Sequence, residues 1–304
     1  MEPDMICVNG NFIPFHDATV HILSPAMKYG LCVFEGIRAY QGSSNLFVFR
    51  LAEHLERLAH SAKATQLDAI PDCGCLEDAL IESLRRNRIQ SDAHIRLQLW
   101  VDGMNGPIAS TGPVSWAIAT VPCGDNLTNP KNVSMGISSW IRPSGNAFPA
   151  LVKTSANYMV GRLAALQAKA AGYDAAVLLN ANGFVAEAPA MSLFIVTGGS
   201  VATPPLYDNI LASITRDTLT SIFRNEMGLT VSERSISPSE LYTADEIMLC
   251  GTANEIQAVT KVDGRRIGDG AAGVITMAAF THYMDIARGR ETLHANWRVA
   301  VYEH

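Results

Sequence analysis

Strand-like and helix-like segments alternate along the whole chain, on both sides of one break that is rich in turn-forming residues. The break is Pro122–Val133, and its sequence PCGDNLTNPKNV holds two prolines, a glycine and several Asn and Asp residues. At 304 residues the chain is longer than a single small domain needs. We therefore expect a mixed α/β protein of two domains, with the linker at this break.

Residue spacing predicts the elements on either side of the break. Short alternating or β-branched runs predict strands, and apolar residues three or four apart predict helices. In the first part these are strands over Met5–Val8, Asn11–Pro14, Leu46–Phe49, His94–Val101 and Val114–Ala119, and helices over Ala52–Ala64 and Cys75–Arg86. In the second part they are helices over Tyr158–Ala171, Thr215–Glu226 and Ala272–Arg288, and strands over Ala175–Leu179, Ser192–Val196 and Glu246–Cys250. Asn182-Gly183 predicts a hairpin that joins the first two of these strands.

Charge and cysteine usage exclude several classes of protein. The formal net charge is −6 without a basic stripe, so nucleic acid is not an expected partner. No run of about 18 apolar residues predicts a membrane span, and the acidic start MEPDMICVNGNF does not resemble a secretory signal. The scattered cysteines match no zinc-site spacing, so we expect reduced thiols, no metal and a cytoplasmic protein. These cysteines are Cys7, Cys32, Cys73, Cys75, Cys123 and Cys250.

Lysine is scarce, with six in the chain, and Lys153 stands apart because it follows the apolar residues Ala150-Leu151-Val152. An ammonium is costly to bury unless it loses its charge, and a neutral amine is what Schiff-base chemistry requires. A lysine at the end of a strand that reaches water fits the same pattern and is the more common outcome. The local pattern leaves both interpretations open.

A second candidate is Glu187, which lies between apolar neighbours in Phe184-Val185-Ala186-Glu187-Ala188-Pro189. Such a carboxylate either caps a loop, which is more common, or faces a cationic partner. A protonated pyridine nitrogen would be a partner of that kind, and the pair would preserve the ring as an electron sink.

Two segments have the form of anion sites. Ser213-Ile214-Thr215-Arg216 opens a predicted helix, whose first N–H groups can bind an anion or simply be capped by Ser213. Gly251-Thr252-Ala253 is a glycine turn after an apolar strand, where backbone N–H groups can approach a ligand. Each pattern is weak by itself.

The order of these segments gives a resemblance over almost the entire chain. The sequence resembles the class IV (fold-type IV) pyridoxal-phosphate-dependent aminotransferases, and among them looks most like the branched-chain amino acid aminotransferases. The motifs that carry the resemblance are Tyr29-Gly30-Leu31-Cys32-Val33-Phe34-Glu35-Gly36-Ile37-Arg38, Arg50-Leu51-Ala52-Glu53-His54-Leu55-Glu56-Arg57-Leu58, Ser138-Ser139-Trp140, Lys153 with Tyr158, Asn180 to Glu187, Ile214-Thr215-Arg216, Val231 to Arg234, Ala244-Asp245-Glu246 and Gly251-Thr252-Ala253.

The resemblance implies a role for each matching residue. Lys153 would form the Schiff base with pyridoxal 5′-phosphate and move the proton between the substrate α-carbon and C4′. Glu187 would pair with the pyridine nitrogen and Tyr158 with the phenolic oxygen. The phosphate would be held by Arg57, the backbone of Ile214 and Thr215, and Thr252.

The substrate side implied by the resemblance consists of Tyr29, Phe34, Arg96 and the Thr252-Ala253 turn. Two positions depart from the family. His94 stands where the family commonly has a tyrosine that helps bind the substrate carboxylate, and we expect its imidazole to donate a hydrogen bond and to be able to carry charge near neutral pH. Ala188-Pro189-Ala190 follows Glu187 where many relatives have another sequence, and Pro189 would stiffen this turn.

The resemblance also implies architecture and activity. We expect a small N-terminal α/β domain over residues 1–122, a linker over 123–133 and a large C-terminal domain over 134–304, with the cofactor in the cleft between the domains. The expected activity is ping-pong transfer of an amino group from an amino acid, with L favoured and either branched-chain-like or a related unusual one, to a 2-oxo acid. The expected assembly is a homodimer or a higher homo-oligomer. A lyase resembling aminodeoxychorismate lyase, a D-amino-acid transaminase and a non-catalytic protein of the same fold are the alternatives.

Overall fold

The computed structural model describes residues 2–123 and 128–302, and the chain divides into two compact units. Unit 1 comprises Met1–Asn126, Val152–Ala156 and Asp285–His304, and unit 2 comprises Leu127–Leu151 and Asn157–Met284. This division differs from the expected one, because two segments of the expected C-terminal domain belong to unit 1. Val152–Ala156 joins unit 1 through hydrogen bonds to strand β3, and the C-terminal segment adds a strand beside β4.

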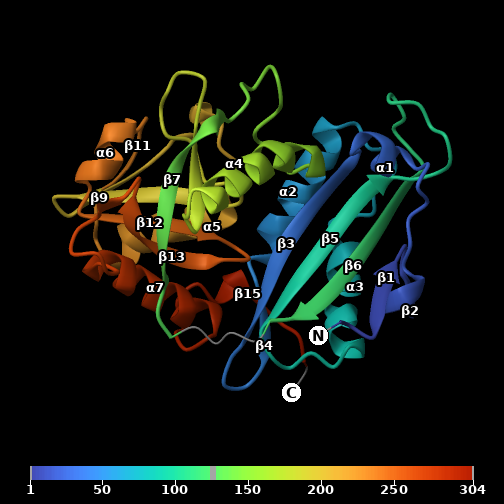
Figure 1. The fold of residues 1–304 in the computed structure, drawn as a ribbon. Coiled ribbons are helices and arrows are strands. Elements are labelled where there is room, and N and C mark those ends of the chain that lie inside the picture. Colours follow the sequence, from blue (N-terminus) through green and yellow to red (C-terminus); the bar gives the residue numbers. More distant parts are fainter. Residues whose placement is uncertain (1, 124–127, 303–304) are drawn as a thin grey trace. The chain divides into compact units, whose positions relative to one another are not determined.

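Unit 1 is built on a seven-stranded sheet with the order β15-β4-β3-β5-β6-β1-β2, in which every paired strand is antiparallel (Figure 1). The strands are β1 (Met5–Val8), β2 (Asn11–Pro14), β3 (Cys32–Gln41), β4 (Leu46–Phe49), β5 (Ala93–Val101), β6 (Val114–Pro122) and β15 (Arg298–Ala300). Short helices lie at η1 (Phe15–Asp17), α1 (Pro25–Tyr29) and η5 (Ala295–Trp297).

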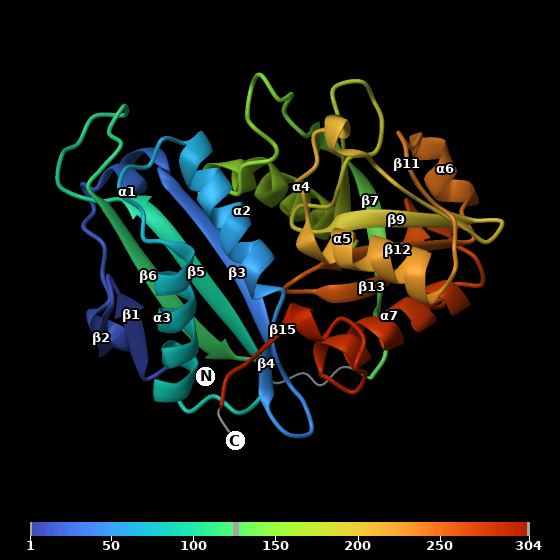
Figure 2. The same cartoon turned by 180° about the vertical axis from the view of Figure 1, so that it is seen from behind.

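One face of this sheet is covered by α2 (Leu51–Ala64) and α3 (Cys73–Arg86), which pack against each other, and α2 runs along β3 (Figure 2). Successive side chains of β5 point to opposite faces of the sheet. Ile95, Leu97 and Leu99 are fully buried in the core of unit 1, whereas Arg96 lies on the opposite, open face. The period of two along the strand therefore decides which side chains are available for chemistry.

Unit 2 is built on an eight-stranded mixed sheet with the order β11-β10-β9-β12-β13-β7-β8, and β14 pairs with β13. The strands are β7 (Lys131–Ile141), β8 (Ala175–Leu179), β9 (Ser192–Thr197), β10 (Ser200–Thr203), β11 (Val231–Glu233), β12 (Glu246–Gly251), β13 (Glu255–Val262) and β14 (Arg265–Arg266). Buried aliphatic residues from β7, β8, β9, β12 and β13 form one core cluster.

Two helices of unit 2, α5 (Ile214–Ser221) and α6 (Pro238–Thr243), begin at a serine that caps them through its side chain. The helix α4 (Tyr158–Ala170) packs on β7 and β8, and α5 packs on β12. A π-helical turn, η4 (Ile222–Glu226), continues α5, and α6 has a capping box formed by Ser237 and Glu240. The helix η3 (Leu206–Asp208) also belongs to unit 2, whereas η2 (Ser155–Asn157) and α7 (Val274–Ala287) each contain residues of both units.

The predicted hairpin at Asn182-Gly183 is wrong. The strands β8 and β9 do not pair with each other, because β8 is an edge strand beside β7 and β9 lies between β10 and β12. The turn itself exists, and it returns the chain for one bridge between Leu179 and Val185. Beyond that bridge the chain stays beside β8, because the Ala186 N–H donates to the Leu178 carbonyl and the Leu178 N–H donates to the Glu187 carbonyl, both at 2.9 Å. The turn therefore pairs β8 with the short segment that ends at Glu187 and not with β9.

Candidate active site

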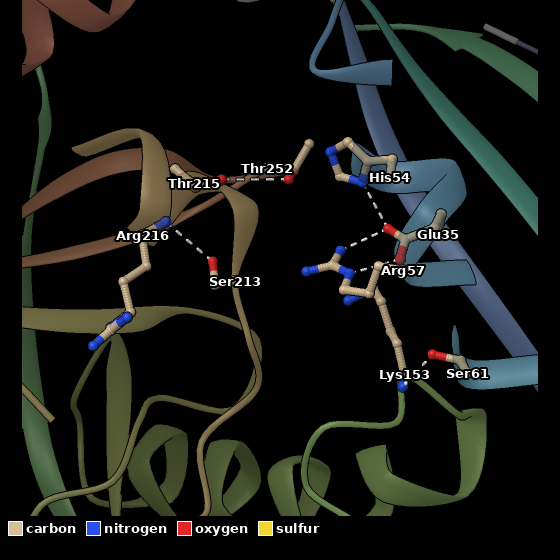
Figure 3. A network of polar contacts seen from close by, with 9 residues as sticks. All are labelled: Glu35, His54, Arg57, Ser61, Lys153, Ser213, Thr215, Arg216 and Thr252. Atoms are coloured by element: carbon tan, nitrogen blue, oxygen red, sulfur yellow. Dashed lines mark hydrogen bonds and ion pairs between the residues drawn. The ribbon is translucent and has the colours of Figure 1, made fainter. Parts of the chain in front are cut away.

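Lys153 is fixed in unit 1 through its backbone. Its carbonyl oxygen accepts a hydrogen bond from the Phe34 N–H at 3.0 Å, and its own N–H donates to Ser61 Oγ at 3.1 Å (Figure 3). Thr154 bridges to Val33 and donates through Oγ1 to the Cys32 carbonyl. The segment thus adds to the edge of β3 and leaves the side chain half-buried, which lies between the two interpretations that the sequence left open.

The open face of the unit 1 sheet carries three more of the expected residues beside Lys153. Phe34 on β3 is buried, the Lys153 amine lies 4.9 Å from its ring centre, and the Arg96 guanidinium stacks on the same ring at 3.4 Å. His94 lies two residues before Arg96 on β5, on the same face. A cavity of about 150 Å³ on this face is lined by Arg96, with Gln98 and Trp100 among its other residues.

His94 is not a charged group in this setting, which corrects the expectation of charge near neutral pH. Burial, together with the positive charges of Arg38, Arg96 and Lys153, lowers the pKa of His94 to about 4. Its ring lies against Gly36, where an added Cβ would come within 3.0 Å of Nε2. At pH 7 the imidazole is therefore neutral, and it can act as a hydrogen-bond donor or acceptor.

Arg57 is held by a buried carboxylate on the helix-covered face of the same sheet. Its Nε and one terminal nitrogen donate to the two oxygens of Glu35, at 2.7 and 2.6 Å (Figure 3). His54, one turn earlier on α2, contacts Glu35 through Nδ1 at 2.7 Å. Burial alone would raise the pKa of Glu35, but Arg57 and His54 outweigh it and hold the pKa at about 2. Glu35 is therefore ionised throughout the physiological range.

Glu187 in unit 2 is also a buried carboxylate with a cationic partner. Its Oε1 lies 2.7 Å from a terminal nitrogen of Arg142, and its Oε2 accepts a hydrogen bond from the Leu211 N–H at 3.2 Å. Arg142 in turn donates through Nε to the Asn209 carbonyl. These contacts orient an ionised carboxylate, which is the form that a protonated pyridine nitrogen requires.

The loop after Glu187 packs tightly on neighbouring elements. A Cβ on Gly161 of α4 would come within 3.0 Å of the Pro189 carbonyl, and a Cβ on Gly251 would come within 2.9 Å of the Ala190 carbonyl. The close approach of this loop therefore requires glycine at position 251, which adds a packing reason to the ligand contact that the sequence suggested. Tyr158 is the first residue of α4, the helix on which the loop packs.

Two threonine hydroxyls of unit 2 come together at the start of α5. Oγ1 of Thr215 lies 3.4 Å from Oγ1 of Thr252, which follows β12 (Figure 3). Ser213 caps the helix by accepting the Arg216 N–H, so the N-cap interpretation is correct for Ser213. The Arg216 side chain points away and bonds Thr203, the Pro204 carbonyl and Glu233.

The remaining expected residues lie at the ends of elements. Tyr29 ends α1, is 39% exposed, and has the Lys28 amine 4.9 Å from its ring centre. Ile214 is the first residue of α5 and is buried, and Ala253 is exposed in the turn between β12 and β13. Tyr29 therefore lies at the end of a helix, Ile214 at the start of one, and Ala253 in a turn between two strands.

Sequence reasoning gave no role to Glu35, His54 or Arg142, although all three hold expected site residues in place. Glu35 and His54 stand inside the motifs that carry the resemblance, and an acid among the apolar residues of a strand is a signal that could have singled out Glu35. Arg142 has no local signal, because its partner Glu187 is distant in the sequence.

The side chains fit pyridoxal 5′-phosphate chemically. An oriented guanidinium and a pair of hydroxyls at a helix start are groups that bind phosphate. An ionised buried carboxylate suits a pyridinium, and a half-buried amine suits an aldehyde.

Two further properties concern metals and membranes. Within residues 2–123 and 128–302, no three His, Cys, Asp or Glu side chains are grouped so that they could hold a metal ion. The helices found in that part of the chain are all too short or too polar to span a bilayer.

Known proteins match the chain over nearly its full length. The family described as amino-transferase class IV matches residues 32–262. A putative branched-chain-amino-acid aminotransferase of Methanocaldococcus jannaschii is 36% identical, over 98% of this chain and 99% of its own length. The branched-chain-amino-acid aminotransferase of Salmonella typhimurium is also 36% identical, with 90% of each chain covered.

Solved structures agree with the sequence comparison. The branched-chain aminotransferase of Thermoproteus uzoniensis, determined with norvaline, superimposes with a TM-score of 0.94 at 38% identity, covering 99% of this chain and 100% of its own. The branched-chain amino acid aminotransferase of Thermobaculum terrenum, determined in its PLP-form, gives a TM-score of 0.94 at 32% identity and covers 99% of each chain. Fold and sequence therefore lead to the same family.

Proposed function

The chain belongs to the class IV aminotransferases, and from that premise we propose that its amino donor is an L-amino acid with a branched aliphatic side chain. It is an aminotransferase whose cofactor is pyridoxal 5′-phosphate and whose second substrate is a 2-oxo acid. The proposal on the donor is supported by relatives named as branched-chain aminotransferases, which match at 31 to 38% identity over 90 to 99% of the chain.

The observation that carries the proposed mechanism is the position of Lys153. Its backbone is bonded on both sides to unit 1, and its amine lies beside the Phe34 ring and near Arg96. Pyridoxal phosphate supplies an electron sink for the carbanion at the substrate α-carbon. Lys153 would hold the cofactor through its aldehyde carbon, with loss of water, and its amine would be the group that takes up and returns the proton of the substrate α-carbon.

We assign the other residues by the chemistry that each can perform. Glu187 pairs with the pyridine nitrogen, and Tyr158 donates a hydrogen bond to the phenolic oxygen. Arg57, the backbone N–H groups of Ile214 and Thr215, and the Thr252 hydroxyl hold the phosphate. On the substrate side we place Tyr29, Phe34, His94, Arg96 and the Thr252-Ala253 turn.

We further propose that the protein is a homodimer. Two segments of unit 1 that hydrogen-bond to each other through Asn105 and Leu23 carry large exposed apolar side chains, which water solvates poorly. These side chains are Val20, Ile22, Leu23, Met27, Met104 and Ile108. Light scattering should give twice the chain mass, and Ile22→Asp with Ile108→Asp should give the monomer.

The domain boundaries at 122 and 134 and a cytoplasmic location remain proposals, the latter supported by the scattered cysteines.

The test of the activity is an absorbance spectrum of the purified holoprotein during addition of single amino acids. The cofactor band should bleach with L-valine, L-leucine and L-isoleucine and return on addition of a 2-oxo acid. Bleaching by D-amino acids alone would favour a D-specific enzyme, and release of pyruvate from an elimination substrate would favour a lyase. A protein that takes up no pyridoxal phosphate would contradict the function.

The substrate carboxylate contact is tested at His94. His94→Tyr restores the residue that the family commonly has, so the KM for branched-chain donors should fall if His94 is what differs in carboxylate binding. The kcat should change less than the KM. Unchanged kinetic constants would remove His94 from the substrate side.

A further inference from the structure

Glu35 is an acid at a position where the fold demands an apolar residue. It lies on β3 between Val33 and Ile37, on the helix-covered face, and it is 0% exposed. Its neighbours on that face belong to the hydrophobic core of unit 1. An ionised carboxylate in such a place is costly unless it is paired and fully hydrogen-bonded. Replacing such a pair by hydrophobic residues is often neutral or stabilising, so a role for Glu35 is to be sought in the orientation of its partners rather than in stability.

The pairing is bidentate and comes from one helix. Arg57 uses Nε and one terminal nitrogen on the two Glu35 oxygens, which fixes both the position and the plane of the guanidinium. His54 lies one turn away on the same face of α2 and bonds the oxygen Oε2. The Arg57 side chain is 10% exposed, while the Glu35 side chain is completely enclosed.

His54 contributes geometry without adding charge. Burial lowers the pKa of His54, and the negative charge of Glu35 offsets only part of that effect. Since Glu35 is ionised and can only accept, the neutral ring carries its proton on Nδ1 and donates it to Oε2. A neutral ring is also favoured because Lys153 and Arg57 are close enough to oppose a third positive charge.

We propose that Glu35 and His54 are positioning residues which fix the Arg57 guanidinium for the phosphate of the cofactor. This inference rests on the proposed role of Arg57 in phosphate binding. Glu35 and His54 contact neither the phosphate nor the reacting atoms in this assignment, and they act through Arg57.

Glu35 can affect phosphate binding through its negative charge or through the orientation of Arg57, and the two effects predict opposite changes in phosphate affinity when Glu35 is removed. If only the electrostatic potential mattered, the negative charge of Glu35 would weaken anion binding, and its removal would strengthen it. If orientation matters more, removal frees the long Arg57 side chain, and ordering it again opposes phosphate binding. The sign of the change in affinity therefore distinguishes the two roles.

The experiment compares two ligands on the apoprotein, pyridoxal 5′-phosphate and pyridoxal, which lacks the phosphate. The dissociation constant of pyridoxal divided by that of pyridoxal 5′-phosphate isolates the contribution of the phosphate, and a smaller ratio means weaker phosphate binding. We expect Glu35→Gln to reduce the wild-type ratio about 10- to 100-fold, the range for a charge-assisted hydrogen bond. His54→Gln should reduce it about 2- to 5-fold, because it loses one hydrogen bond to Glu35. Pyridoxal affinity should change little in both variants.

Controls separate positioning from general destabilisation. Asp92→Asn breaks another buried Arg–carboxylate pair of unit 1, the one with Arg288, and should lower the stability but leave the ratio unchanged. Glu35→Asp keeps the charge but is one methylene shorter, so it should also lower the ratio and serves if Glu35→Gln does not fold. In an Arg57→Met background, Glu35→Gln should have no further effect on the ratio.

The outcomes separate this inference from the proposed function. A wild-type protein that does not prefer the phosphorylated ligand would overturn both. A wild-type preference that is unchanged or increased in Glu35→Gln and Glu35→Asp would overturn the positioning role alone. Equal losses of the ratio in Asp92→Asn and Glu35→Gln would assign the effect to stability and would also overturn it.

Discussion

The two units hold their candidate anion-binding groups in different ways. In unit 1 the group is a full charge, the Arg57 guanidinium, fixed by a second full charge that is completely buried. In unit 2 it consists of neutral dipoles, the start of α5 and the hydroxyls of Thr215 and Thr252. A paired charge binds an anion strongly, but its position depends on one partner. Several dipoles each contribute a small part of the affinity, so removal of one of them lowers the affinity little.

The largest expected effect concerns Lys153, and it tests whether unit 1 supplies more than positive charge. Lys153→Ala should lower the rate of amino-group transfer about 10²- to 10⁴-fold, the usual cost of losing a general acid–base group. Lys153→Arg keeps the charge but cannot lose its proton, so it should be equally impaired. Single-turnover bleaching of the cofactor band measures the rate, with Lys169→Ala on the exposed side of α4 as the control. An active Lys153→Arg would mean that only charge matters here.

Arg57 gives the next largest effect and tests the strength of the paired charge. Arg57→Met should weaken binding of pyridoxal 5′-phosphate about 100-fold, because it removes a charge-assisted contact and leaves Glu35 buried without its main partner. Equilibrium titration of the apoprotein measures this affinity. The exposed Arg86→Met on α3 is a matched control and should bind normally. A loss of less than threefold would place the phosphate elsewhere.

His94 provides a test through pH. Its pKa of about 4 lies below the ordinary value of 6.5, so below pH 6.5 the unfolded chain takes up a proton that the folded protein refuses. The folded state therefore loses stability as the pH falls from 6.5 to 4. His94→Gln should reduce the loss between pH 7 and pH 5 by about 1–2 kcal/mol, allowing for solvent screening. Urea unfolding at both pH values measures the loss of stability. An equal loss in the wild type and in His94→Gln would contradict the conclusion that His94 is neutral in the folded protein.

The smallest effects are expected in unit 2. Thr215→Val and Thr252→Val should each weaken pyridoxal 5′-phosphate binding about 3- to 10-fold, the value of one hydrogen bond. The double variant should lose less than the product of the two, since the hydroxyls contact each other. Thr243→Val, exposed on α6, is the control. A loss as large as that of Arg57→Met would remove the contrast between the units.

The elements that sequence predicted best are those whose pattern is local. The spacing of Leu76, Leu80 and Leu84 predicted α3, and the alternation through His94–Val101 predicted β5, both to within about two residues. The strand β3 was quoted as a motif but not identified as a strand. Its buried acid and its nearly continuous burial hide the alternation that marks a half-exposed strand.

The sequence did not predict which distant segments pair with each other, and the reason is physical. A two-residue turn such as Asn182-Gly183 reverses the chain wherever it occurs, but pairing of the flanking strands depends on which other strands compete for their edges. Here β12 and β10 occupy the edges of β9. Likewise, the sequence places Val152–Ala156 after the break, yet its hydrogen bonds to β3 and Ser61 assign it to unit 1.

By itself the sequence determined the family, the cofactor and the expected identity of the site residues, because chemistry needs given side chains in a given order and these survive as motifs. Only the tertiary structure decided what holds those side chains: Glu35 and His54 behind Arg57, Arg142 behind Glu187, and the charges that keep His94 neutral. Burial and partner charges are sums over residues distant in sequence. No local pattern contains them, so they exist only once the chain has folded.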